Sequence, residues 1–360
     1  MAARLASGGT PDGTAAGPGR RPDHVGRAHL YAALHRLEPE AGWDRIGHRF
    51  LEGGLTTAGP AGLFNGGLAG LGVAAALLKG PTGRYGNLLA KVDGAIDRVE
   101  NHVENHDLME GTTGVGVYLL MRPLPERRRA VVGALAKAAA GDPPFHVPPH
   151  RVPPAWALPQ GYADCGLAHG AAGPLALLAL LSEEHTEVPA GTLARIADWL
   201  LDVAHTDEWG IAWPAGVAGR DRLPSPRRAS WCYGVPGIAR ALWLAGRALN
   251  EPGYQSVARE AMTALLDHPE AWGIGASPDL CHGLGGLLLV TGAFAADDER
   301  FGTAVGDLLD RVLGAFDPDL PLGFATGGEG LLTGAAGVAL ALLTVTGDAP
   351  GPAARPFLVA

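Results

Sequence analysis

The stretch Leu280-Cys281-His282-Gly283-Leu284-Gly285-Gly286 joins metal-capable side chains to glycines spaced as Gly-x-x-Gly, and an apolar run follows it. The stretch Ser230-Trp231-Cys232-Tyr233-Gly234-Val235-Pro236-Gly237 has the same form. Cys232 and Cys281 each lie two residues before the first glycine, which predicts that both thiols lie at one level of a repeated structure. His282 adds an imidazole. Two thiols and an imidazole without an obvious fourth ligand are typical of a catalytic zinc site with an open position.

The Gly-x-x-Gly unit occurs six times along the chain, and an apolar segment follows each copy. The copies begin at Gly67, Gly111, Gly170, Gly234, Gly283 and Gly334. Segments such as 175–181 and 338–343 are apolar all round. This pattern predicts six helices that are buried on every side.

Segments of a second kind lie between these copies. Residues 88–103 carry apolar side chains at spacings of three and four, as do 193–203 and 301–312, which is the pattern of an amphipathic helix with one solvated face. Buried helices that alternate with amphipathic ones predict an all-α fold, a six-fold α/α toroid. It would be a double-layered barrel of six inner and six outer helices with almost no β-strand, and the inner helices would all start at one central mouth.

The chain is predicted to hold one domain at 26–347, between two tails. Residues 1–25 are rich in glycine, alanine, proline and arginine and lack the apolar core of a signal peptide, which indicates a disordered N-terminal tail. Residues 348–360 would form a C-terminal tail. The proline- and glycine-rich connections 141–161 and 207–228 are long for a compact domain, and we expect them to border the mouth.

Composition narrows the possible functions. Of 360 residues, 47% are hydrophobic and 18% charged, which is enough apolar material for a large core. A net charge of −9 argues against a nucleic-acid partner. Three cysteines are a poor disulfide framework and favour a cytoplasmic location. Uncharged stretches such as 280–296 approach membrane-spanning length, but they open with glycine-rich turns, so we expect no integral membrane segment.

Further polar residues precede the glycine units and would meet at the mouth: Asp107 and Glu110, His169, and Tyr233. Each has a plain structural alternative. The cysteines could be small buried hydrophobic residues, His169 could be a structural histidine, and Asp107 could cap the following helix. Spacing alone leaves these alternatives open.

Four stretches resemble the motifs of the lanthionine synthetase C-like (LanC-like) cyclases. They are Trp231-Cys232-Tyr233-Gly234, Cys281-His282-Gly283, Gly166-Leu167-Ala168-His169-Gly170 and the acidic motif His106-Asp107-Leu108-Met109-Glu110-Gly111. They occur in the order of the family, and the resemblance spans all six repeats. It implies an α/α toroid and a zinc ion bound by Cys232, Cys281 and His282.

The resemblance also implies catalytic or substrate-handling roles for His169, Asp107, Tyr233 and Arg228, which stands four residues before Cys232. The implied function is that of a zinc-dependent lanthipeptide cyclase in antibiotic biosynthesis. Cysteine thiols of a dehydrated precursor peptide would add to dehydroalanine or dehydrobutyrine and close lanthionine or methyllanthionine rings. A separate dehydratase would supply the peptide, in the cytoplasm or beside a membrane-associated biosynthetic complex. Unlike some members, the chain shows no inserted β-rich subdomain.

Three alternative functions remain open at this point. A LanC-like enzyme could add a small thiol such as glutathione to dehydroamino acids. A non-catalytic, peptide-binding module could contain a structural zinc ion. An α/α-toroid glycoside hydrolase would need a carboxylate pair, for which Asp107 with Glu110 is the candidate.

Overall fold

The computed structural model describes residues 23–57, 59, 61–79, 83–100, 105–347 and 351–359. Residues 1–22 of the expected N-terminal tail therefore lie outside the described residues. The described residues contain 13 α-helices and five short β-strands. The contacts divide the chain into two compact units, a first unit of Met1–His102 with Gly275–Leu358 and a second unit of Val103–Ile274.

Seven helices in the described residues are buried over most of their length. They are α2 (His24–Leu37), α4 (Leu68–Leu78), α12 (Leu284–Asp297) and α14 (Ala335–Thr346) in the first unit, and α6 (Thr112–Leu120), α8 (Ala172–Glu183) and α10 (Val235–Leu249) in the second. Six of them begin at the six Gly-x-x-Gly units, which confirms the predicted buried helices. Helix α2 is a seventh, which no Gly-x-x-Gly unit precedes.

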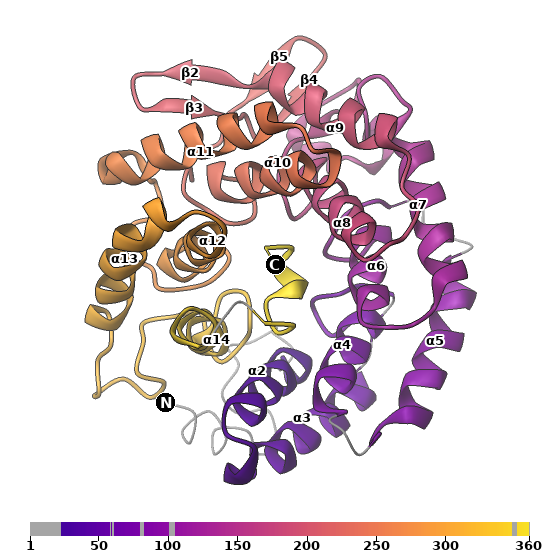
Figure 1. Ribbon diagram of the computed structural model, residues 1–360, viewed down its shortest axis with the longest axis vertical. Coiled ribbons are helices and arrows are strands. Elements are labelled where there is room, and N and C mark those ends of the chain that lie inside the picture. Colours follow the sequence, from indigo (N-terminus) through magenta and orange to yellow (C-terminus); the bar gives the residue numbers. More distant parts are fainter. Residues whose placement is uncertain are drawn as a thin grey trace. The chain divides into compact units, whose positions relative to one another are not determined.

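Six further helices are amphipathic. They are α3 (Trp43–Thr57), α5 (Gly86–Glu100) and α13 (Gly302–Gly314) in the first unit, and α7 (Pro125–Ala139), α9 (Ala190–Val203) and α11 (Pro252–Asp267) in the second. In α9, Leu193, Ile196 and Leu200 are buried on one face, as the spacing predicted. Figure 1 shows α9 and α11 alongside the buried helices α8 and α10, onto which they pack.

Five of the buried helices are each preceded by a loop of the same form, which closes over the start of the helix. In each, the N–H of the residue after the first glycine donates to the carbonyl seven residues earlier, at 2.8–2.9 Å. The bonds are Thr112 to Asn105, Ala171 to Asp164, Val235 to Arg228, Leu284 to Ser277 and Ala335 to Gly328. We call the six residues in between an entry loop. The entry loops are 106–111, 165–170, 229–234, 278–283 and 329–334, and each ends on the first glycine of its unit.

The entry loop explains why the glycines are spaced as they are. A Cβ atom at Gly234 would collide with the carbonyl oxygen of Arg228, and a Cβ atom at Gly237 would collide with that of Trp231. The loop backbone therefore lies directly against the first turn of the helix, and only glycine leaves room for it.

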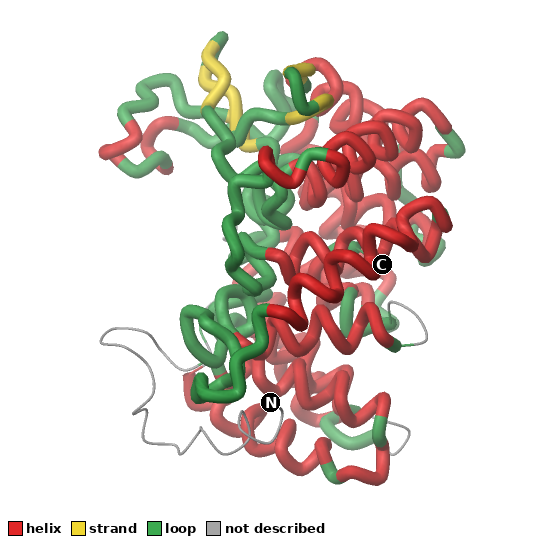
Figure 2. Tube along the Cα trace, turned by 90° about the vertical axis from the view of Figure 1, so that its left-hand side faces the viewer, coloured by secondary structure: helices red, strands yellow, loops and turns green. Residues whose placement is uncertain are grey.

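Short strands of two or three residues lie between helices of the second unit, so the described residues hold little strand, as predicted. They are β1 (Ala163–Asp164), β2 (His205–Asp207), β3 (Gly210–Ala212), β4 (Gly216–Ala218) and β5 (Asp221–Leu223). Strands β1, β4 and β5 form one antiparallel sheet, and β2 pairs with β3 in a hairpin. Much of the connection predicted at 207–228 is therefore paired backbone, shown in yellow in Figure 2.

The segment after α14 belongs to the core of the first unit. Within 351–359, Phe357 is fully buried and its ring lies 5.9 Å from that of Phe64. The Nε2 atom of His29 lies 2.9 Å from the carbonyl oxygen of Ala353. The C-terminal tail predicted at 348–360 is thus packed against the helices where the structure describes it. Among the described residues, no helix combines the length and the apolarity needed to cross a bilayer.

Candidate active site and metal-binding residues

The residues predicted from the sequence hold equivalent places in the entry loops. His169, Tyr233 and His282 occupy the fifth position of their loops, and Cys232 and Cys281 occupy the fourth. The residues that the sequence spacing predicted to be equivalent therefore occupy matching positions in the backbone of their loops. Each of these residues precedes the first residue of a buried helix by two or three positions.

In two entry loops, an aspartate at the second position binds the backbone N–H of the residue at the fifth position. Oδ1 of Asp107 accepts from the N–H of Glu110 at 2.8 Å, and Oδ1 of Asp279 accepts from the N–H of His282 at 2.8 Å. Such side-chain bonds to the nearby backbone are typical of Asp in turns. No pattern in the sequence marked Asp279, which fixes the backbone N–H of a predicted zinc ligand.

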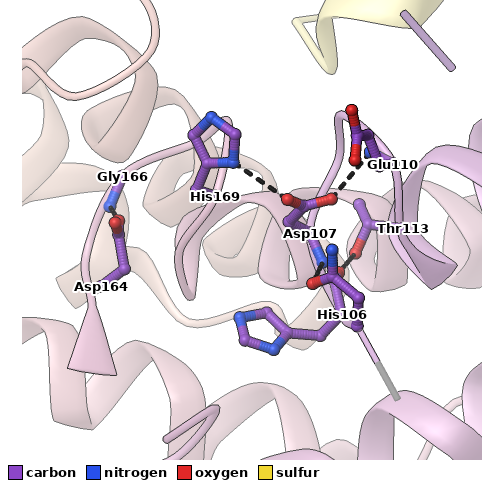
Figure 3. A network of polar contacts seen from close by, with 8 residues as sticks. His106, Asp107, Glu110, Thr113, Asp164, Gly166 and His169 are labelled. Atoms are coloured by element: carbon purple, nitrogen blue, oxygen red, sulfur yellow. Dashed lines mark hydrogen bonds and ion pairs between the residues drawn. The ribbon is translucent and has the colours of Figure 1, made fainter. Parts of the chain in front are cut away.

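His169 and Asp107 form the pair with the clearest catalytic geometry. Nδ1 of His169 lies 2.9 Å from Oδ2 of Asp107, and their side chains are 41% and 11% exposed. Figure 3 shows the two side chains pointing toward each other, with Asp107 also bound to Glu110. Because Nδ1 is bound to the carboxylate, Nε2 of His169 remains available for a substrate.

Pairing raises the pKa of His169 and lowers the pKa of Asp107. Burial by itself would lower the pKa of His169, but the hydrogen bond and charge of Asp107 outweigh it, so the pKa lies above its ordinary value. Burial would raise the pKa of Asp107, but the hydrogen bonds from His169 and the Glu110 N–H hold it below its ordinary value. The imidazolium form is therefore favoured, as a general acid requires.

Tyr233 lies beside this pair. The Tyr233 and His169 rings are 5.9 Å apart with 29° between their planes. Burial is the main cause that raises the pKa of Tyr233 above its ordinary value, and the charge of Asp164 adds to it. Asp164 is 2% exposed. No sequence signal marked it, because neither a glycine nor a metal-ligand pattern includes it.

Arg228 is held by the hairpin of β2 and β3. Its guanidinium donates to Oδ2 of Asp207 at 2.7 Å and to the carbonyl oxygens of Trp209 and Gly210 at 3.2 and 2.9 Å. The side chain is 10% exposed. Its bonds tie the hairpin to the residue that immediately precedes the entry loop of α10.

Cys281 and His282 in the first unit, and Cys232 at the matching entry-loop position in the second, supply two thiols and an imidazole, a donor set that could hold a metal ion. Within the first unit, Sγ of Cys281 lies 3.6 Å from Nε2 of His282. Tetrahedral zinc with bonds of about 2.3 Å to sulfur and about 2.0 Å to nitrogen places two such atoms about 3.5 Å apart. The donor set and this separation fit zinc. Cys165 is fully buried, and burial raises the pKa of its thiol, so it remains a protonated core residue.

A cavity of about 820 Å³ lies beside the His169–Asp107 pair in the second unit. His106, Asp107, His169 and Tyr233 line one part of it. The connection predicted at 141–161 lines much of the rest, together with Tyr162. A second cavity of about 440 Å³ is lined by Arg228 and the connection at 207–228. Both long connections thus border cavities.

Residues 24–350 match the family described as "Lanthionine synthetase C-like protein". The chain belongs to the lanthionine synthetase C-like family. The match covers nearly all the described residues, including all five entry loops. Comparison with curated protein sequences finds no match.

The LanC-like chain is also similar to a solved structure titled "Nisin cyclase". The TM-score is 0.77 at 19% sequence identity, over 93% of this chain and 90% of that one. At this identity the likeness establishes the fold, an α/α toroid, which confirms the predicted fold class. The seven buried helices in the described residues exceed the six predicted by one, α2.

Proposed function

We propose that this LanC-like protein is a zinc-dependent lanthipeptide cyclase that closes thioether rings in a dehydrated precursor peptide. The observation that carries the proposal is the His169–Asp107 pair, at 2.9 Å beside a cavity. Family membership and the likeness to nisin cyclase support the reaction class. Cysteine sulfur would add to the β-carbon of dehydroalanine or dehydrobutyrine, and the α-carbon would take up a proton.

The metal would be held by Cys232, Cys281 and His282. These residues supply two thiolates and one imidazole, which leaves a fourth position for the peptide thiol. When bound, zinc would deprotonate that thiol, since a free cysteine has a pKa of about 8.5 and the thiolate is the nucleophile. The N–H of His282 is fixed by Asp279, which would help to keep the ligand in place.

His169 is proposed to supply the proton that completes the addition. As sulfur bonds to the β-carbon, the electrons of the double bond move toward the adjacent carbonyl and form an enolate. The imidazolium of His169 would donate its Nε2 proton to the α-carbon, and Asp107 would orient the ring through Nδ1. The raised pKa of His169 keeps this proton available near neutral pH.

Tyr233 and Arg228 are proposed to support this chemistry. The Tyr233 ring packs beside the His169 ring and would limit its orientations. Arg228 is held by Asp207 and two backbone carbonyls, which favours a role in holding the hairpin beside the entry loop over direct contact with the enolate. Lys137 and Arg151 add positive charge to the cavity wall, which suits acidic peptide segments.

The substrate is proposed to be a peptide with internal cysteines, prepared by a separate dehydratase in the cytoplasm. The test offers the protein a dehydrated precursor in the presence of glutathione and measures the product mass after alkylation. Cyclisation leaves the mass of the peptide unchanged and removes alkylatable thiols. Glutathione adducts whose peptide cysteines still react would favour addition of small thiols and would contradict the cyclase proposal.

A further inference from the structure

The second cavity of the second unit lies beside the entry loop of α10, and the proposed proton transfer does not use it. Its volume of about 440 Å³ falls within the range of about 300–1,000 Å³ that ligand pockets occupy. Strands β2, β3 and β5 and the segment 224–228 form most of its wall. Arg228 immediately precedes the entry loop and Gly234 ends it, and both line the cavity. A ligand bound there would therefore lie next to the loop that carries Cys232.

Two residues that line this cavity each have a buried nitrogen without a hydrogen-bond partner among the described residues. The atoms are Nε of Arg228 and Nδ1 of His205. The Arg228 side chain is 10% exposed, and its terminal nitrogens already bind Asp207 and carbonyls of the hairpin of β2 and β3. A buried donor that has lost water without gaining an acceptor costs free energy, and such groups are rare in native proteins. The Nε–H of Arg228 therefore indicates a bound acceptor.

The charge of the wall favours an acceptor that is an anion. Among the described residues that line the cavity, Asp207 is the single carboxylate, and Arg228 pairs with it at 2.7 Å. Arg222 donates to the carbonyl oxygen of Ala204 at 3.3 Å, and no ion pair joins it to a carboxylate of the described residues. Burial is the main cause that lowers the pKa of His205, so its neutral ring offers one N–H donor. These donors and the charge of Arg222 suit a carboxylate, which forms strong charge-assisted hydrogen bonds.

We propose that this cavity binds an acidic side chain of the precursor peptide, an aspartate or a glutamate close to the residues that form the ring. The inference rests on the proposed function, because it takes a precursor peptide as the substrate. Binding would hold the peptide beside the entry loop that carries Cys232. The apolar parts of the wall would contact the peptide on either side of the carboxylate, and they include Trp209, Pro214, Pro224 and Pro226.

The first test measures binding without catalysis, by isothermal titration calorimetry of the full-length protein with an unreactive peptide. This acetylated peptide amide carries one glutamate before and one after a segment in which alanine and serine replace dehydroalanine and cysteine. Its blocked termini leave the two glutamates as its only carboxylates. Wild type should bind it at least about tenfold more tightly than the same peptide with glutamine at both positions. Equal affinities would overturn the proposal.

Variants of the cavity wall locate the binding site. Arg222→Gln removes a charge and His205→Phe removes a donor, and neither residue takes part in the bonds between Arg228 and the hairpin. Each variant should weaken binding of the glutamate peptide about 5- to 20-fold and leave binding of the glutamine peptide within about twofold.

Arg220→Gln is the matched control for Arg222→Gln. Arg220 lies exposed in the turn between β4 and β5 and is not among the residues that line the cavity, but its loss changes the net charge by the same amount. This variant should bind the glutamate peptide as wild type does. Equal weakening by both variants would show that only the overall charge attracts the peptide, and it would contradict a site in the cavity.

Cyclisation assays separate this inference from the proposed function. Their substrates are the same two peptides with dehydroalanine and cysteine restored, separated by three alanines. Replacing glutamate by glutamine should raise KM about tenfold in wild type with kcat within about twofold, and Arg222→Gln should abolish that difference. Equal KM values for two peptides that are both cyclised would overturn the acidic site and leave the function intact. Binding of the glutamate peptide through Arg222 without any cyclisation would refute the function, while the site would stand.

Discussion

Asp107 and His169 belong to consecutive entry loops, at the second and fifth positions, and their side chains meet at 2.9 Å. The backbone of each loop is closed by its own hydrogen bonds, so the imidazole can be removed without opening either loop. His169→Ala should keep its fold and its zinc but cyclise about 10²- to 10⁴-fold more slowly, the range for loss of a general acid or base. Stopped assays of ring formation and metal analysis measure the two effects. Loss of zinc would move His169 into the metal site, and an unchanged rate would leave it structural.

Zinc stoichiometry gives the second prediction. We expect one zinc per chain in the purified protein and none in a Cys232→Ala, Cys281→Ala double variant, because an imidazole alone binds zinc weakly. Cys165→Ala is the matched control, since this third cysteine is fully buried and should not alter the zinc content. Undiminished zinc in the double variant would rule out the ligand assignment.

The glycines of the repeat give a prediction about stability. In Gly237→Ala the new Cβ atom would meet the carbonyl oxygen of Trp231, and overpacking of this kind costs about 1–3 kcal/mol. Gly133 lies exposed within α7 with open space where a Cβ would stand, so Gly133→Ala should stabilise the protein by about 0.5–1 kcal/mol. Urea unfolding of both variants measures the difference. Equal effects would show that the close approach at Gly237 relaxes at little cost.

Acid should destabilise the first unit through His29. Burial lowers the pKa of this histidine from 6.5 to about 4. The unfolded chain then binds the proton more readily than the folded one, so stability is complete above about pH 6.5 and falls as the pH drops toward 4. At pH 5 the loss should be about 2 kcal/mol. His29→Gln should lose less between pH 7 and pH 5 in urea unfolding, whereas His185→Gln, at an exposed position, should behave like wild type.

The sequence was sufficient to predict the buried helices other than α2, and amphipathic helices beside them, because two independent patterns marked them. Glycine pairs marked the starts of six buried helices, and spacings of three and four marked amphipathic helices such as α9. Residues that share one place in a repeat also share one place in the entry loops, so spacing alone identified His169, Tyr233 and His282 as equivalent.

Features that rest on contacts between distant residues were missed. Helix α2 is buried by neighbouring helices, including α3, α4 and α14, but its own sequence mixes polar and apolar residues. The strands at 205–223 are three residues long, too short for an alternating pattern. Asp164 is buried where β1 pairs with β4, and its strand partner Gly216 lies 52 residues further along the chain.

The bond that closes each entry loop joins two backbone groups, and the required glycine lies at the sixth position. Neither demands a particular side chain at the fourth or fifth position. Glu110 and Thr333 occupy fifth positions where other loops hold His169 and Tyr233. Reactivity in this scaffold can therefore be exchanged by single-codon changes without altering chain length or loop shape. Duplicated helix pairs could have diverged in this way, one loop at a time, and a designer could install an imidazole at Thr333 by the same route.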